Sequence, residues 1–270
     1  MTPETMDALT AAMFNATSSG YGEPTGLHSS IARYNQQSIL QQGGAFAVAQ
    51  RDRDTALLRA LLPAPACTVR VLAIGDSITV GYGSADNQGW RPWLASLIGC
   101  QRIQPVMSVH AHGGWTLADA KPGLAAFLTA ATPDIVCVNL GTNEWIPDAA
   151  AQAAYQTAYG QMIDQILASS PAVKVACALI PISQAANIQA AETRANAAIT
   201  AAIQARASTG RVALSDQRRT TSAEWTARAT DGSEYPPGRW TFDGIHPTDA
   251  GYLRMAQAWL ATIQNWLPTP

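Results

Sequence analysis

The segment Val71-Leu-Ala-Ile-Gly-Asp-Ser-Ile-Thr79 is the clearest indication of the fold of this chain. It begins with a short, wholly apolar run, which is typical of a strand buried in a parallel sheet. Gly75 ends the run and permits a sharp turn out of the sheet, because glycine has no Cβ. Ser77 follows at the carboxyl end of the strand, where open α/β sheets bind their ligands. A serine that merely caps a strand-to-turn junction would give the same local pattern, so the interpretation depends on the rest of the chain.

Strand-like and helix-like segments alternate from residue 68 onward. Pro133 and Pro171 precede two of the strands, as expected where a helix ends. Such alternation predicts a parallel sheet with helices on both faces. We expect strands at 69–74, 103–110, 134–140, 173–180 and 212–214, and helices at 89–98, 117–130, 149–168, 187–207 and 248–266.

The prefix of residues 1–66 differs from the α/β part, 67–270, and predicts a partly helical N-terminal extension. Its residues 45–62 mix apolar and charged side chains as an amphipathic helix does, and Pro63 ends that helix. The extension shows no chemistry of its own. Packing on the domain, self-association into a homo-oligomer and a part in the substrate wall all stay open as its role.

The composition excludes several classes of partner. The formal net charge is -2 and no polybasic run is present, so we expect neither nucleic acid nor an anionic membrane as a partner. The sequence holds no apolar stretch long enough to span a bilayer, so we expect no stable membrane insertion. Residues 1–15 lack the basic start and apolar core of a secretory signal, which leaves a cytoplasmic protein or one whose signal has been removed.

The four cysteines lack CxxC spacing, so we expect no zinc site. Cys137 and Cys177 lie in apolar strand-like runs and are predicted to be buried thiols. A bridge between Cys67 and Cys100 stays open. Neither a Walker A motif nor GxGxxG is present, so we expect no nucleotide cofactor.

A second polar cluster, Asp243-Gly-Ile-His246-Pro247, opens the last predicted helix. Pro247 suits the first turn of that helix. A carboxylate three residues before the histidine can fix one imidazole nitrogen and leave the other to take a serine proton. A helix cap formed by Asp243 or Thr248, beside an incidental histidine, is the alternative.

Two further stretches follow predicted strands. In Val138-Asn-Leu-Gly-Thr-Asn-Glu144 a buried strand ends in glycine and then Asn143, whose amide can donate to an oxyanion. In His110-Ala-His-Gly-Gly-Trp-Thr116 the paired glycines let the backbone approach a ligand. Because strand ends of one polarity share one edge of a parallel sheet, we expect these groups to meet Ser77 there.

The four stretches together resemble the SGNH (GDSL-like) hydrolase superfamily of esterases and lipases. The matching motifs are Gly75-Asp-Ser-Ile-Thr79, Gly114 in Gly-Gly-Trp-Thr, Gly141-Thr-Asn-Glu144 and Asp243-Gly-Ile-His-Pro247. The resemblance implies a flavodoxin-like, three-layer α/β/α fold with a five-stranded parallel sheet in the order 2-1-3-4-5. It makes 67–270 the catalytic domain of an esterase that needs no metal and no cofactor.

The resemblance also implies a role for each motif. Ser77 is the nucleophile, and His246 is the base, oriented by Asp243. The oxyanion hole is formed by the backbone N–H groups of Ser77 and Gly114 and by the side chain of Asn143. A second glycine directly before Gly114 leaves a one-residue ambiguity in that assignment.

We predict a serine esterase that hydrolyses carboxylic esters through an acyl-enzyme. Short acyl chains, such as acetyl esters of carbohydrates or small alcohols, are favoured because aromatic side chains lie beside the motifs and no apolar run marks an acyl tunnel. The candidate substrate-binding residues are Asp76, Trp115, Trp145 and Trp240. Core packing is the alternative for each tryptophan.

Three alternatives stay open. A lysophospholipase or thioesterase would use the same site on longer acyl chains. A metallohydrolase would use His110 and His112, although no third ligand is evident. A non-catalytic carbohydrate-binding protein would lack an activated serine. A classical α/β-hydrolase is disfavoured, because the serine motif lacks the second glycine of GxSxG.

Overall fold

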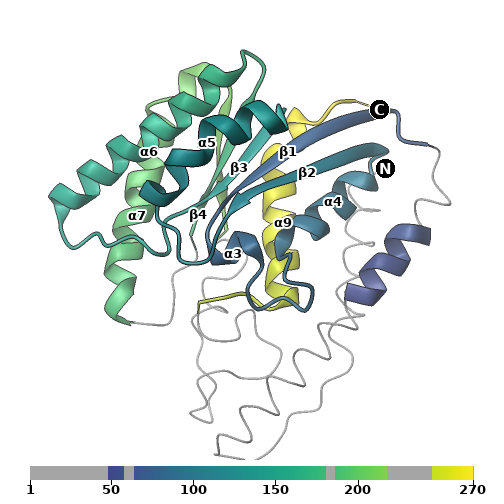
Figure 1. Ribbon diagram of the computed structural model, residues 1–270, viewed down its shortest axis with the longest axis horizontal. Coiled ribbons are helices and arrows are strands. Elements are labelled where there is room, and N and C mark those ends of the chain that lie inside the picture. The colour runs from purple at the N-terminus through teal and green to yellow at the C-terminus, as the bar shows by residue number, and fades with distance from the viewer. Residues whose placement is uncertain (1–47, 58–63, 181–185, 218–244, 270) are drawn as a thin grey trace, which may run out of the picture.

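The computed structural model describes residues 48–57, 64–180, 186–217 and 245–269. Within them lies a five-stranded parallel sheet in the order β2-β1-β3-β4-β5, flanked by helices on both faces (Figure 1). The strands are β1 (Cys67–Gly75), β2 (Ile103–Ala111), β3 (Ile135–Asn139), β4 (Lys174–Leu179) and β5 (Val212–Asp216). This confirms the flavodoxin-like fold and the strand order.

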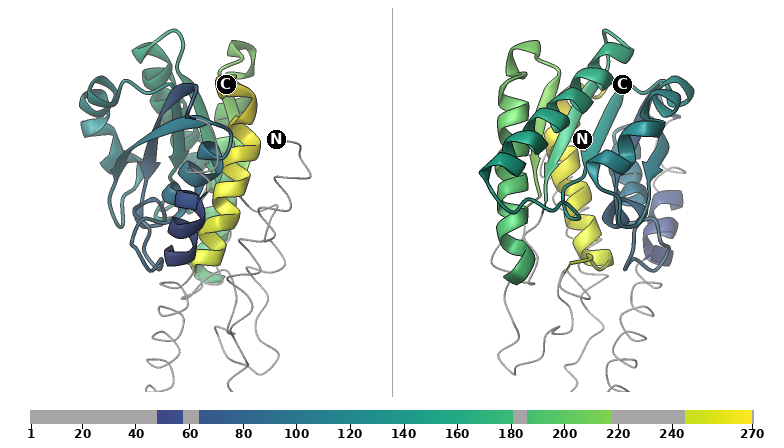
Figure 2. Two further views of the ribbon diagram at one scale, coloured as in Figure 1. Left: turned by 90° about the vertical axis from the view of Figure 1, so that its right-hand side faces the viewer. Right: turned by 60° about the vertical axis from the view of Figure 1, so that its left-hand side comes forward.

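The helices form the two outer layers. They are α3 (Ser77–Val80), α4 (Trp90–Gly99), α5 (Leu117–Ala131), α6 (Ala149–Ser169), α7 (Ala186–Gln204) and α9 (Asp249–Ile263). Two 3-10 turns, η1 (Ala207–Thr209) and η2 (Gln264–Trp266), follow α7 and α9. Residues 48–57 are also helical, within the segment where an amphipathic helix was predicted. Figure 2 shows α9 on one face of the sheet and α6 and α7 on the other.

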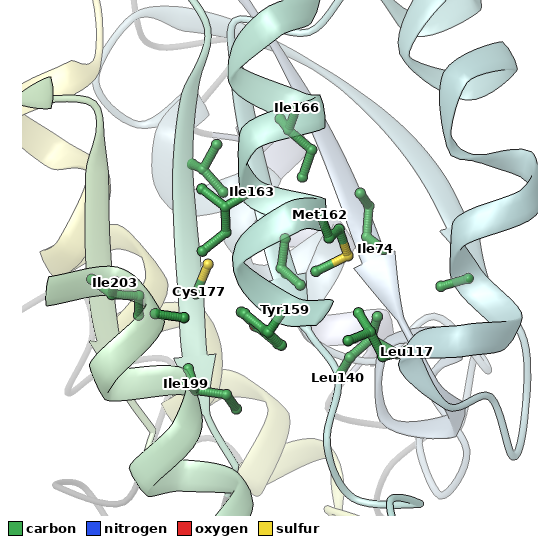
Figure 3. Close-up of a cluster of buried hydrophobic side chains, with 14 of the residues drawn as sticks. Ile74, Leu117, Leu140, Tyr159, Met162, Ile163, Ile166, Cys177, Ile199 and Ile203 are labelled. Carbon is green, nitrogen blue, oxygen red and sulfur yellow. The ribbon is translucent and has the colours of Figure 1, made fainter. Parts of the chain in front are cut away.

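The larger part of the core fills the space between the sheet and helices α5, α6 and α7 (Figure 3). Side chains of β1, such as Ile74, meet Leu117 of α5 and Met162 of α6, and all three are nearly or fully buried. Burying one such side chain contributes about 1.5–3 kcal/mol relative to leaving it exposed. The opposite face of the sheet packs on α4 and α9, where the rings of Trp90 and Trp259 lie 5.3 Å apart.

The strand register aligns the ends of the three strands that precede the site. Gly75, the last residue of β1, pairs with Ala111 of β2 on one side and with Asn139 of β3 on the other. Ala111 and Asn139 are also the last residues of their strands. The segments that begin at residues 76, 112 and 140 therefore leave the sheet at the same level, as expected from the sequence.

All four cysteines carry free thiols, so Cys67 and Cys100 are not bridged. Cys137 and Cys177 are buried in the sheet, as predicted, and burial raises the pKa of the Cys177 thiol to about 12. In the part of the chain that the structure describes, every helix falls short of the length and apolarity that crossing a membrane requires.

Candidate active site

Ser77 stands at the point where the chain turns out of β1. A Cβ on Gly75 would lie 2.0 Å from Thr79 Oγ1 and 2.7 Å from the carbonyl oxygen of Asn139, so only glycine fits there. Asp76 then caps α3, and Ser77 is the first residue of that helix. The first N–H groups of a helix have no acceptor within it. The backbone N–H of Ser77 is therefore not used by the hydrogen bonds within α3. The Ser77 side chain beside it is half-buried.

His246 meets Ser77 from the other end of the chain. Its Nε2 lies 2.9 Å from Ser77 Oγ, which is the distance at which an unprotonated imidazole nitrogen accepts a hydroxyl proton. The imidazole also packs edge-on against the ring of Tyr82, with 4.6 Å between the centroids. Thr248 caps α9 by accepting a hydrogen bond from the Gly251 N–H, and so fixes where the helix begins, just after His246.

The loop after β2 passes beside the serine. The His112 N–H donates to the Gly75 carbonyl at 3.3 Å, which continues the strand pairing one step past β2. A Cβ placed on Gly113 would lie 4.0 Å from the Cβ of Ser77. Gly114 has φ +80°, in the left-handed region that favours glycine. The backbone of this loop therefore runs close to the serine, where its N–H groups can be turned toward a ligand.

The loop after β3 is joined to the loop after β2 by two hydrogen bonds. The Asn143 side-chain amide donates to the Trp115 carbonyl at 3.0 Å, and the carboxylate of Glu144 accepts from the N–H of Leu117. An amide nitrogen carries two N–H groups, so the bond to Trp115 leaves Asn143 a second donor for a ligand. Burial raises the pKa of the Glu144 carboxyl group.

The family follows from comparison with known proteins. The sequence profile of the GDSL-like Lipase/Acylhydrolase family matches residues 73–254, a span that contains Ser77, Asn143 and His246. The chain belongs to this family. It is therefore a hydrolase of carboxylic esters, as lipases and acylhydrolases are. The comparison with curated proteins gives no significant match.

Solved structures share the fold of this GDSL-like hydrolase. A family 3 carbohydrate esterase from Clostridium thermocellum is 21% identical, with a TM-score of 0.55 over 73% of this chain and 96% of that chain. A single-residue variant of Axe2, an acetyl xylan esterase from Geobacillus stearothermophilus, is 20% identical, with a TM-score of 0.53 over 72% and 93%. A lipase/acylhydrolase from Enterococcus faecalis is 18% identical, with a TM-score of 0.56 over 74% and 98%.

Asp76 of this GDSL-like hydrolase is buried inside the protein, whereas a residue that binds substrate must be accessible to it. Its exposed fraction is 0%, and its carboxylate accepts a hydrogen bond from the N–H of Ile78 at 2.9 Å. Burial raises the pKa of Asp76 to about 6, while the Ile78 N–H and the nearby Thr142 hydroxyl oppose that rise. The expectation that Asp76 contacts substrate is wrong, because the side chain points into the protein and holds the start of α3.

Two of the candidate tryptophans lie in the part of the chain that the structure describes. Trp115 is half-buried, packs on the core below α5, and meets the His110 ring with 4.9 Å between centroids. Trp145 follows Glu144 and is 77% exposed, so its side chain does not pack in the core. Trp240 and Asp243 lie outside the described residues.

The two histidines of the alternative metal site have different surroundings. His110 is buried between Trp115 and Phe127, and its Nε2 lies 2.8 Å from the Ala120 carbonyl oxygen. His112 is exposed, and its Nδ1 lies 2.8 Å from the carbonyl oxygen of Gly113. Among the described residues, no group of three or more His, Cys, Asp or Glu side chains is arranged to hold a metal ion.

Two residues at the site were not singled out from the sequence. Tyr82 lies five residues after Ser77, in a turn that follows a four-residue helix, so no periodicity links it to the motif. Glu144 belongs to a matched motif, but its bond to Leu117 depends on how two loops meet. Its position next to Asn143 is the one signal in the sequence that could have indicated a role at the site.

Proposed function

We propose that this hydrolase is a serine esterase that cleaves short acyl esters, such as acetyl esters of carbohydrates or small alcohols, through an acyl-enzyme. The observation that carries the proposal is the 2.9 Å separation of Ser77 Oγ and His246 Nε2. An alcohol beside an unprotonated imidazole is the arrangement that activates a serine nucleophile.

The proposed reaction has two halves. His246 Nε2 removes the Ser77 proton as Oγ attacks the ester carbonyl, and Asp243 orients the imidazole. The negative charge that develops on the carbonyl oxygen is held by the N–H groups of Ser77 and Gly114 and by the amide of Asn143. His246 then returns the proton to the departing alcohol. Water, activated by the same imidazole, hydrolyses the acyl-enzyme and frees Ser77.

Two kinds of observation favour a short acyl group on a carbohydrate or small alcohol. Trp145 is 77% exposed near Asn143 in the chain, so it offers a flat apolar surface of the kind that sugar rings stack on. Two structures with this fold are described as a carbohydrate esterase and an acetyl xylan esterase. Trp115 and Trp240 are the further candidates for the substrate wall.

The test compares p-nitrophenyl acetate, octanoate and palmitate as substrates for the wild type and for Ser77→Ala. We expect acetate to give the highest kcat/KM with the wild type, and Ser77→Ala to lose turnover of every ester. A fluorophosphonate should label the wild type and spare Ser77→Ala, because only an activated serine reacts. Near-native turnover by folded Ser77→Ala would disprove the role of the serine. A preference for palmitate would instead favour a lysophospholipase or thioesterase.

A further inference from the structure

The helix of residues 48–57 lies before the span that matches the family, residues 73–254. It carries a buried charged side chain. Arg51 is 5% exposed. Its guanidinium lies over the ring of Trp93 in α4, 5.1 Å from the ring centroid, and its Nη1 pairs with Asp86 Oδ2 at 3.0 Å. Burying a guanidinium is costly unless it is paired. The guanidinium also pairs with Asp52 of its own helix at 2.7 Å, so of these two carboxylates Asp86 is the one that ties the helix to the hydrolase domain.

A second polar bond fixes the same helix one turn further on. The Thr55 hydroxyl donates to Ser96 Oγ at 3.0 Å, and Ser96 belongs to α4. Together with Arg51, this bond holds the helix against α4 at two points. Figure 1 shows the 48–57 helix on the α4 side of the molecule.

Asp86, which receives Arg51, organises the loop of residues 81–89 that joins α3 to α4. Its second carboxylate oxygen accepts from the Ser84 hydroxyl at 3.1 Å and from the Gln88 N–H at 2.9 Å. The carboxylate thus faces Arg51 with one oxygen and the loop's own donors with the other. The position of Arg51 and the shape of the loop are linked through this one side chain.

The 81–89 loop is in turn tied to the start of α9. The Ala85 N–H donates to the Asp249 carboxylate at 3.3 Å, and the Tyr252 hydroxyl donates to the Tyr82 carbonyl at 2.7 Å. Asp249 and Tyr252 lie in the first turn of α9, just after His246. The Tyr82 ring itself packs edge-on against the His246 imidazole.

We infer that the 48–57 helix is part of the active-site architecture, with Arg51 as a positioning residue for His246. Arg51 holds Asp86, Asp86 shapes the 81–89 loop, and the loop presents Tyr82 to one side of the imidazole. Without Arg51 the loop loses its outer anchor, and the imidazole spends less time aligned with the serine hydroxyl. This inference rests on the proposed role of His246 as the base.

The test uses the full-length chain and four variants. Arg51→Met keeps an unbranched apolar side chain and removes the guanidinium that lies over Trp93 and pairs with Asp86. Asp86→Asn keeps a side-chain oxygen for the loop's own donors and removes the ion pair. The double variant combines them. Arg53→Ala is the control, because it removes an arginine from the same helix. The Arg53 side chain is exposed, and its guanidinium donates to Gln50 of that helix.

Two readouts report on the serine and its base: kcat and KM for p-nitrophenyl acetate, and the rate of inactivation by a fluorophosphonate. We expect Arg51→Met and Asp86→Asn each to lower kcat and the inactivation rate about 3- to 30-fold, with KM little changed. The double variant should lose no more than the larger single loss, because both changes break one link. Arg53→Ala should match the wild type.

Three outcomes would overturn the inference. They are wild-type rates for folded Arg51→Met, a double variant whose loss in rate is the product of the two single losses, and an effect confined to KM. If Arg51→Met does not fold, Asp86→Asn alone decides between wild-type and reduced rates. Failure of the proposed function looks different, because Ser77→Ala would then retain turnover. Loss of activity in Ser77→Ala together with wild-type rates in Arg51→Met would disprove only the positioning role.

Discussion

Ser77 Oγ and His246 Nε2 lie 2.9 Å apart although 169 residues separate them in the chain. One residue opens the first helix after β1, and the other precedes the last helix of the domain. The fold brings them together because β1 is an inner strand of the sheet and α9 packs across the face beside it. A pair built this way should act as one unit.

Replacing either member of the pair should therefore remove most of the catalysis. We expect Ser77→Ala and His246→Ala each to lower kcat for p-nitrophenyl acetate by about 10⁴- to 10⁶-fold. The double variant should be no slower than the slower single variant, since neither residue activates an ester without the other. Steady-state kinetics on folded proteins, checked by circular dichroism, measure this. Losses that multiply in the double variant would show that the two side chains act independently.

The role of Asn143 can be separated from simple substrate binding. A donor to the oxyanion acts mainly in the transition state, so Asn143→Ala should lower kcat by about 10²- to 10³-fold with little change in KM. Asn143→Asp is the shape-matched comparison. It removes the N–H donors and puts a carboxylate beside the oxyanion, so its loss should be at least as large. A rise in KM at nearly constant kcat would make Asn143 a substrate-binding residue instead.

The sequence was sufficient to predict the sheet and the meeting point of the motifs. Apolar runs ending in glycine or a polar residue mark β1 and β3, and a parallel sheet places their carboxyl ends at one edge. The register bears this out, because Gly75 pairs with both Ala111 and Asn139. The sequence pattern therefore predicts where these strands end without any knowledge of tertiary contacts.

Other features depend on contacts that no local pattern encodes. Helix α3 has four residues, too few to show a helical period. Asp76 reads like a ligand-facing carboxylate because it adjoins Ser77, but the turn after Gly75 directs it inward. Arg51 sits in a segment with alternating charges that resembles a solvated helix face, and its burial follows only from the arrangement of Asp86 and Trp93.

Glu144 should matter for rate through the loop that it holds. Its carboxylate accepts from the Leu117 N–H and so ties the loop after β3 to the start of α5. We expect Glu144→Ala to lower kcat about 10-fold, as is typical of residues that act through others. Glu144→Gln keeps an oxygen acceptor and should stay within about threefold of the wild type. Equal losses in both variants would mean that the charge, and not the hydrogen bond, is what counts.

Asp76 should make the stability of the protein depend on pH. Burial raises its pKa to about 6 in the folded protein, above its ordinary value, so the folded state binds the proton more tightly than the unfolded chain. This group therefore lowers the free energy of unfolding as pH rises from about 4 to about 6, by up to about 3 kcal/mol.

Asp76→Asn removes that contribution and keeps an oxygen for the Ile78 N–H. Its free energy of unfolding, measured with urea, should gain on that of the wild type as pH rises through this range, and the gain should level off above about pH 7. Asp249, whose pKa burial also raises to about 6, is present in both proteins, so its contribution cancels in the difference. Parallel curves for the two proteins would contradict the burial of a titrating Asp76.

Gly75 provides the last test, because its environment differs sharply from that of Gly99. A methyl group at position 75 would meet Thr79 Oγ1 at 2.0 Å and backbone at 2.7 Å, whereas one at position 99 meets nothing within 4 Å. We expect Gly75→Ala to lower the free energy of unfolding by about 3 kcal/mol and to displace Ser77, with loss of esterase activity. Gly99→Ala, at the end of α4, should leave activity unchanged and raise stability by about 0.4–1 kcal/mol. A Gly75→Ala protein as stable and active as Gly99→Ala would show that the turn presenting the serine is not closed against β3 as the structure has it.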